Sequence, residues 1–167
     1  MTSGEWAVLL EEDGTSGVID IEDELAIGTF DIKSHPFGLE RYLQEFLRDN
    51  WENIPEFQNW KLFEQDGDVV GVEFNTNEVG RIDLLAHHKT EARWLVIELK
   101  RHQSSDQTIG QVLRYMGWVD KNLKSDEEKV EGLIISREID VNIQYALKQT
   151  RDVGIMLYDV AFSLRTI

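Results

Sequence analysis

The strongest constraint on how this chain folds is an apolar segment that carries charged residues at its end. Residues 94–99 are apolar except for Glu98, and Lys100 follows directly. Alternate residues of a β-strand face the same side, so Glu98 and Lys100 share a face with Trp94. Charged side chains in a buried strand are costly unless they are paired or bind a metal. The segment therefore predicts a buried strand whose end forms a polar site.

A neighbouring predicted strand, residues 81–88, places a third ionisable residue, Asp83, in an apolar setting. Two carboxylates on consecutive strands can lie close together, and their repulsion raises one pKa unless a cation lies between them. Hard cations such as Mg²⁺ bind carboxylate and carbonyl oxygens, which makes the Leu99 carbonyl a further candidate ligand. Lys100 could orient a nucleophilic water or stabilise charge on a phosphate. The group suits metal-assisted phosphodiester hydrolysis, and the alternative is a buried ion pair without chemistry.

The periodicity of the remaining chain predicts a mixed α/β fold. Helical stripes of apolar residues occupy segments 39–50, 106–123 and 141–151, and strand-like segments occupy 59–65, 69–74, 81–88, 93–100, 130–135 and 154–160. Tight turns between the earlier strands predict an antiparallel meander, and the later β–α–β unit predicts a parallel pair. Residues 1–33 predict a β-hairpin or short meander, joined to the core or used in pairing between subunits. With no internal repeat, residues 1–167 are expected to form one domain.

Composition limits the function classes. The chain has no cysteine, which excludes a zinc–thiolate site and a cysteine nucleophile. Its formal net charge of −15 argues against autonomous, tight, non-specific nucleic-acid binding, because neutralisation of phosphates by Lys and Arg drives that affinity. A nucleic-acid function would therefore need a local basic patch, a divalent metal or a partner. The sequence shows no signal pattern and no long apolar run, so we expect a cytoplasmic protein without a membrane segment.

Three motifs in this chain resemble those of the PD-(D/E)XK nuclease superfamily, and most closely the C-terminal nuclease domain of NucS/EndoMS-type endonucleases. They are Gly80-Arg-Ile-Asp83, Val96-Ile-Glu98-Leu-Lys100 and Gln111-Val-Leu-Arg-Tyr115. The resemblance covers residues 36–136 and implies a restriction-endonuclease-like α-β-β-β-α-β core with a mixed central sheet flanked by helices. Residues 1–33 would then be a β-rich N-terminal extension and residues 137–167 a C-terminal α-β extension.

The resemblance also implies an acid from the first core helix. Residues 40–50 match the family pattern E-x-x-[LM]-x-x-[FL]-[IL]-x-x-N, with Glu40 as the acid. Glu45 fits this frame less well. Without the resemblance, Glu40 reads as a first-turn acid favoured by the helix dipole.

The roles that the family implies divide among six side chains and one carbonyl. The metal ligands for Mg²⁺ or Mn²⁺ would be Glu40, Asp83, Glu98 and the Leu99 carbonyl. Lys100 would assist the water or the transition state, while Gln111 and Tyr115 would help to place the phosphate backbone or metal-bound waters.

Arginines near these motifs are candidates for the local basic patch. They are Arg81, Arg101 and Arg114, and the alternative for each is an ion pair with a surface acid. His87 and His88 end the strand that carries Asp83, and we expect both to be exposed.

The predicted function is that of a divalent-metal-dependent endonuclease that hydrolyses DNA. The alternative is a catalytically weak or inactive nuclease-like subunit that binds nucleic acid or protein within a DNA repair or defence complex, and RNA cleavage is a third reading. The longer NucS-type proteins carry a separate N-terminal DNA-binding domain, whereas an acidic segment of about 35 residues precedes the core here. Substrate preference and homodimer formation therefore stay open.

Overall fold

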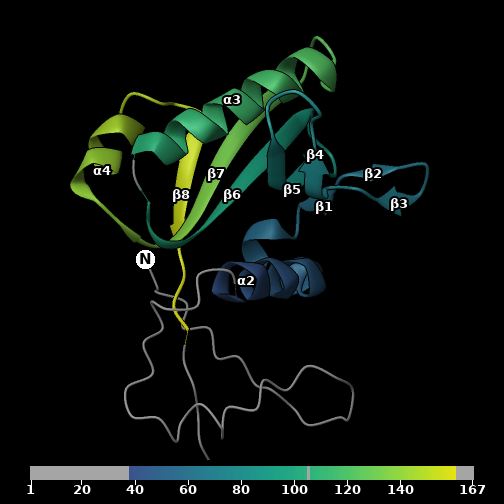
Figure 1. Cartoon of the computed structure of the whole chain (residues 1–167). Helices are drawn as coiled ribbons and strands as arrows, with labels where there is room; N and C mark the ends of the chain where they lie inside the picture. Colours follow the sequence, from purple (N-terminus) through teal and green to yellow (C-terminus); the bar gives the residue numbers. More distant parts are fainter. Residues whose placement is uncertain (1–37, 105, 161–167) are drawn as a thin grey trace, which may run out of the picture. The chain divides into compact units, whose positions relative to one another are not determined.

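The structure is a computed structural model that describes residues 38–104 and 106–160, apart from the side chains of residues 38–39 and 101–106 (Figure 1). Residues Phe37–Tyr158 form one compact unit, which carries the elements below. The β-rich extension predicted at residues 1–33 lies outside the described residues. Within the described ranges, no helix is long and apolar enough to cross a membrane.

The elements follow the α/β order that the sequence predicts. In chain order they are α2 (Gly38–Asp49), the 3-10 turns η2 (Trp51–Asn53) and η3 (Pro55–Phe57), β1 (Trp60–Leu62), β2 (Glu64–Gln65), β3 (Asp68–Val69), β4 (Val72–Asn75), β5 (Arg81–His88), β6 (Arg93–Ser104), α3 (Asp106–Asn122), β7 (Lys129–Ile139), α4 (Val141–Leu147) and β8 (Val153–Leu157). The start of α4 has a local cause, because the Asp140 side chain accepts a hydrogen bond from the Ile143 N–H at 2.7 Å and caps the helix.

One mixed sheet organises the unit, with strand order β1-β5-β6-β7-β8 and β4 also paired to β5. The strands β1, β4 and β6 run antiparallel to β5, as the predicted meander requires. The pairs β6–β7 and β7–β8 are parallel, with α3 and α4 in the connections. The prediction of a mixed sheet flanked by helices is therefore confirmed, and β8 belongs to the same sheet as the core strands.

The edge of the sheet beside β5 is one strand interrupted by a small hairpin. Leu62 pairs with Ala86, and Val72 pairs with Leu84, so β1 and β4 continue each other along β5 while β2 and β3 pair only with one another. The predicted hairpin of residues 59–74 is therefore confined to β2 and β3. The chain returns from the β2–β3 hairpin to the sheet at Gly71. An added Cβ there would lie 2.3 Å from the Leu85 carbonyl oxygen, so only glycine fits.

Two apolar layers lie on opposite faces of β6. Leu95, Ile97 and Leu99 pack in the cluster beneath α2, and Trp94 and Val96 pack in the cluster beneath α3. The alternation predicted for this strand is confirmed, and α2 and α3 flank the sheet (Figure 1). Glu98 follows Trp94 and Val96 in the two-residue period, so its side chain belongs to the face on which α3 packs.

Candidate metal centre

The two central carboxylates lie where β5 and β6 diverge. Paired positions between these strands run from His87↔Trp94 to Leu84↔Ile97. Just beyond the last of these pairs, the Leu99 N–H donates to Oδ2 of Asp83 at 2.7 Å. A side-chain carboxylate therefore accepts the bond in place of a backbone carbonyl of β5. This bond orients Asp83 toward the end of β6 that carries Glu98.

Glu98 is held by a single partner on one of its two oxygens. Its side chain is only 2% exposed, and Oε1 accepts a hydrogen bond from Nζ of Lys100 at 2.5 Å. Oε2 is buried and has no hydrogen-bond partner among the described atoms. A buried carboxylate oxygen without a partner carries a desolvation penalty. A simple ion pair with Lys100 therefore satisfies only one of the two carboxylate oxygens of Glu98.

Burial sets the electrostatics of the site. Burial is the main reason that the pKa of Asp83 is raised to about 6, and the hydrogen bond from the Leu99 N–H acts in the opposite direction. Burial and then the charge of Asp83 raise the pKa of Glu98 to about 7. Burial alone would lower the pKa of Lys100, but the hydrogen bond and charge of Glu98 outweigh it, so the pKa is raised. Near neutral pH the site thus holds an ammonium beside two carboxyl groups that resist ionisation.

Helix α2 brings a third acid toward this pair. The charge of Glu40 acts on both carboxylates and raises the pKa of Asp83 and of Glu98. One turn along the helix, Nε2 of Gln44 donates to the backbone carbonyl of Asp83 at 3.0 Å. Glu45 is engaged elsewhere, because its Oε1 pairs with Arg41 at 2.9 Å.

Sequence reasoning missed Gln44, although a signal was available. Residues four apart on a helix lie on the same face, so a polar residue four positions after Glu40 belongs beside it. The bond to Asp83 joins residues that are far apart in the chain and depends on how α2 packs against the sheet.

The donor set fits a hard divalent cation in its chemistry. Within residues 38–104 and 106–160, no group of three or more His, Asp or Glu side chains is arranged as a complete metal-binding cluster. Mg²⁺ and Mn²⁺ prefer oxygen donors. The carboxylates of Asp83 and Glu98 provide them, including the partnerless Oε2 of Glu98, and Glu40 is close enough for its charge to act on both. The ligand role of the Leu99 carbonyl stays a prediction.

The motif residues on α3 contact the first motif. Nε2 of Gln111 donates to the hydroxyl of Tyr115 at 3.2 Å, and Tyr115 is 4% exposed. Gly80 has φ of +116°, which disfavours any L side chain, and a Cβ there would lie 3.0 Å from the Tyr115 hydroxyl, which would have to shift. Thr76, which sequence reasoning missed, is buried and donates from Oγ1 to the Gly80 carbonyl at 2.6 Å.

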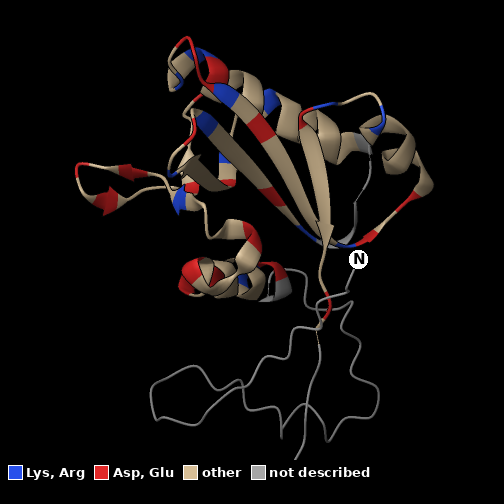
Figure 2. Ribbon diagram, turned by 180° about the vertical axis from the view of Figure 1, so that it is seen from behind, with Lys and Arg blue, Asp and Glu red and all other residues tan. Residues whose placement is uncertain are grey.

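The predicted basic patch divides among different partners. Nη1 of Arg81 pairs with Oε2 of Glu73 at 3.1 Å. The Arg114 guanidinium lies over the Tyr115 ring at 5.5 Å from its centroid. Arg101 belongs to β6, but its side chain lies outside the described residues. Acidic positions outnumber basic ones along the ribbon, in line with 32 Asp and Glu against 17 Lys and Arg in the chain (Figure 2).

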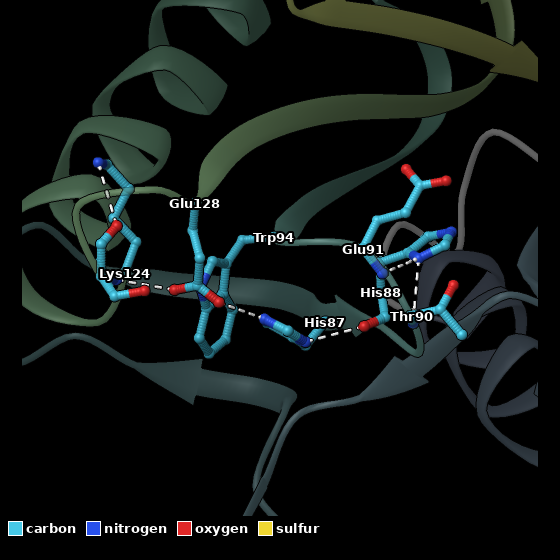
Figure 3. Close-up of polar contacts among 8 residues, drawn as sticks. His87, His88, Thr90, Glu91, Trp94, Lys124 and Glu128 are labelled. Atoms are coloured by element: carbon cyan, nitrogen blue, oxygen red, sulfur yellow. Dashed lines mark hydrogen bonds and ion pairs between the residues drawn. The ribbon is translucent and has the colours of Figure 1, made fainter.

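The prediction that His87 and His88 are both exposed is wrong for His88. His88 is 6% exposed, and its Nδ1 accepts a hydrogen bond from the Glu91 N–H at 2.9 Å. His87 Nε2 lies 2.6 Å from Oε1 of Glu128, whose other oxygen accepts from the Trp94 indole N–H at 3.0 Å (Figure 3). The turn after β5 holds the His88 ring inward, whereas the His87 side chain is 36% exposed; both lie at the opposite end of that strand from Asp83.

A mixed sheet with carboxylates on two neighbouring strands and a lysine two residues after the second is the arrangement expected of the PD-(D/E)XK class. Residues 63–166 match the family described as "YhcG PDDEXK nuclease domain". The match covers more than half of the chain, and the chain belongs to this family.

Known relatives point the same way. The chain is 30% identical over 115 residues to "Endonuclease NucS" of Methanocaldococcus jannaschii, which covers 68% of this chain and 42% of that protein. Two solved structures share the fold: a repair endonuclease from Pyrococcus abyssi, with a TM-score of 0.53 and 15% identity over 72% of this chain and 46% of that one, and an EndoMS–double-stranded DNA complex, with a TM-score of 0.52 and 16% identity over 71% and 44%. The chain thus spans less than half the length of these relatives.

Proposed function

We propose that this chain is a divalent-metal-dependent endonuclease that hydrolyses DNA phosphodiester bonds. The observation that carries the proposal is the buried Oε2 of Glu98, which has no partner among the described atoms, in a carboxylate whose pKa is raised by burial and then by the charge of Asp83. A site with no chemistry would gain stability by replacing this group with an apolar one. Membership of a nuclease family and the similarity to Endonuclease NucS support the same conclusion.

The residues of the chain would divide the work as follows. Asp83, Glu98 and Glu40 would hold Mg²⁺ or Mn²⁺, which supplies charge stabilisation at the phosphate and lowers the pKa of a coordinated water. The Leu99 N–H keeps Asp83 in place through its 2.7 Å hydrogen bond. Lys100 stays an ammonium beside Glu98, where it can orient the attacking water or stabilise charge as it develops on the phosphate.

Gln111 and Tyr115 are proposed to act as positioning residues rather than as metal ligands. Their mutual hydrogen bond and the close approach of Gly80 to the Tyr115 hydroxyl keep the start of β5 against α3. In this way they would set the position of Asp83 and of the phosphate backbone. Arg114, stacked on Tyr115, would contact the backbone from the same helix.

The test is cleavage of single-stranded, mismatched, branched and flap DNAs with Mg²⁺ or Mn²⁺, with matched RNAs as competitors. Asp83→Ala and Lys100→Ala should each lower the rate by at least about 10²-fold, because each removes a group that acts at the reacting phosphate. Glu127→Ala removes an exposed acid in the loop after α3 and serves as the control. The proposal fails if no substrate is cut in a metal-dependent manner, or if the two site variants cleave like the control.

The net charge of −15 favours a second candidate, a nuclease-like module that binds nucleic acid or a protein within a repair or defence complex. Its signature would be DNA binding in Ca²⁺ that survives Asp83→Ala, together with the absence of cleavage in Mg²⁺ and Mn²⁺. Preferential cleavage of the RNA competitors would instead identify a ribonuclease.

A further inference from the structure

A polar groove opens between α2 and the edge strand β4, next to the candidate metal centre. It encloses about 370 Å³ and is lined by Arg41, Gln44, Glu45, Arg48, Val72 and Glu73. Two of these residues connect it to the carboxylates. Gln44 donates to the backbone carbonyl of Asp83, and Glu73 pairs with Arg81, two residues before Asp83. A ligand that occupies the groove therefore lies beside the strand that carries Asp83.

Two guanidinium groups, Arg41 and Arg48, line this groove, and each pairs with an acid. Arg41 pairs with Glu45 at 2.9 Å and Arg48 with Asp49 at 2.7 Å, both within α2. Arg81 pairs with Glu73 at 3.1 Å across β4 and β5.

Such pairs are weak, because water screens exposed charges and holding two long side chains together costs entropy. A phosphate can therefore replace the carboxylate as partner at little cost, and the planar guanidinium suits bidentate contact with phosphate. The carboxylates would keep the arginines extended until the phosphate arrives.

We propose that this groove is a subsite for the phosphodiester backbone of DNA, in which Arg41 and Arg48 hold phosphates that neighbour the one at the carboxylates. The inference rests on the proposed function and extends it by naming where the strand lies. Arg41 and Arg48 would supply the cationic contacts with phosphate that a chain of net charge −15 needs in order to hold DNA. Gln44, whose amide already bonds to Asp83, would act as a positioning residue that couples the filled groove to the metal centre.

The test measures binding of a fluorescent DNA duplex and a fluorescent single strand to the full chain in Ca²⁺, at several salt concentrations. Arg41→Ala/Arg48→Ala should lower affinity by about tenfold and reduce the slope of log K against log salt by about 1–2, because each lost phosphate contact removes about one unit. Lys121→Ala/Lys129→Ala removes the same charge from exposed sites on α3 and β7 and is the matched control. Equal losses in the two double variants, or no loss in either, would overturn the proposal.

Glu45→Gln supplies a change in the opposite direction, which damage to the fold cannot mimic. It releases Arg41 from its pair and removes an acid from the groove, so DNA should bind a few-fold more tightly. Weaker binding would argue instead that the groove takes a basic partner. Asp83→Ala separates the two proposals, since it should abolish cleavage while leaving the effects of the arginine and Glu45 variants on binding intact. A wild-type chain that binds but does not cut DNA would refute the enzyme alone, and one that binds no DNA would refute the subsite.

Discussion

A buried carboxylate at the candidate centre is costly to the stability of the fold. Glu98 is buried beside Asp83, and one of its oxygens has no hydrogen-bond partner among the described atoms. A cation would complete this arrangement, whereas an apolar side chain of similar volume would stabilise the fold more. Residues of this kind are expected to lower the free energy of unfolding in the absence of metal.

Glu98→Gln should stabilise the metal-free chain at pH 8. The pKa of Glu98 is raised to about 7 in the folded state from an ordinary value of 4.5, so the folded state binds the extra proton between these values. The stabilisation that protonation provides is present at low pH and lost as the pH rises through 7. A neutral amide avoids that loss, and we expect a gain of about 1–3 kcal/mol at pH 8 and little change at pH 4.

Urea unfolding in EDTA at the two pH values measures this effect, with Glu127→Gln as the control for an exposed acid. A variant that is less stable than the wild type at pH 8 would show that the pair with Lys100 dominates over the burial of Glu98.

Gly80 is constrained by both its backbone and its neighbour. Its φ of +116° disfavours any L side chain, and an added Cβ would lie 3.0 Å from the Tyr115 hydroxyl. Gly80→Ala should therefore lower the free energy of unfolding by about 1–3 kcal/mol. In the background of Tyr115→Phe the loss should be smaller but not absent, because the backbone strain remains.

Thermal or urea unfolding of the two single variants and the double variant measures this coupling. Gly117→Ala is the matched control: it lies in α3 with no atom within 4 Å of an added Cβ, and it should stabilise the helix by about 0.5–1 kcal/mol. Equal losses for Gly80→Ala in both backgrounds would mean that the hydroxyl does not restrict this position.

At the scale of elements, the two ends of the β5–β6 pair perform different tasks. At one end the strands diverge, and Asp83 takes the Leu99 N–H. At the other end they are tied together and to the loop after α3, because Glu128 accepts hydrogen bonds from the Trp94 indole and the Ser125 N–H and contacts His87 (Figure 3). The contacts of Glu128 hold β5 and β6 together at the end opposite Asp83, so the strands can part beside Asp83 without separating along their length.

Glu128→Ala should destabilise the fold by about 1–3 kcal/mol at pH 7, because it leaves several donors without their acceptor. Burial would raise the pKa of Glu128, but the hydrogen bonds from Ser125, His87 and Trp94 outweigh it and hold the pKa at about 2. The contribution of an acid with a lowered folded pKa is complete above its ordinary value and is lost as the pH falls toward 2.

The difference between wild type and variant should therefore shrink below about pH 4.5. Urea unfolding from pH 3 to pH 7 measures it, and Glu127→Ala on the neighbouring position should be neutral throughout. A difference that is constant with pH would assign the effect of Glu128 to packing rather than to its charge.

For the whole molecule, the acidic surface and the candidate centre predict different responses to divalent cations. General screening of 32 acidic residues should stabilise every variant alike. A cation at the candidate centre should add a specific increment of about 2.7 kcal/mol when its concentration is a hundred times the Kd. That increment depends on Asp83 and Glu98.

Melting temperatures with Mg²⁺ or Mn²⁺, compared with KCl at the same ionic strength, separate these effects. We expect the specific increment in the wild type and in Glu127→Gln, and its loss in Asp83→Asn/Glu98→Gln. EDTA should reverse it. An increment of the same size in the double variant would place the cation elsewhere on the acidic surface.

Local periodicity was enough to predict the mixed sheet and the two faces of β6, and motif spacing selected the candidate site residues, whose roles stay predictions. A two-residue or 3.6-residue period is a property of neighbouring positions, so it can be read without knowing what an element packs against. The same reasoning predicted the buried stripe of α3, in which Val112 and Val119 are fully buried.

The contacts between distant segments were decided only by packing. The bond from Gln44 to Asp83, the bond from the Leu99 N–H to Asp83 and the groove beside α2 each join elements that are separated along the chain. A local sequence pattern cannot predict these contacts, because they depend on how α2 packs on the sheet and on where β5 and β6 part. The residue types thus indicate the proposed chemistry, and the packing of α2 on the sheet decides which side chains surround the candidate centre.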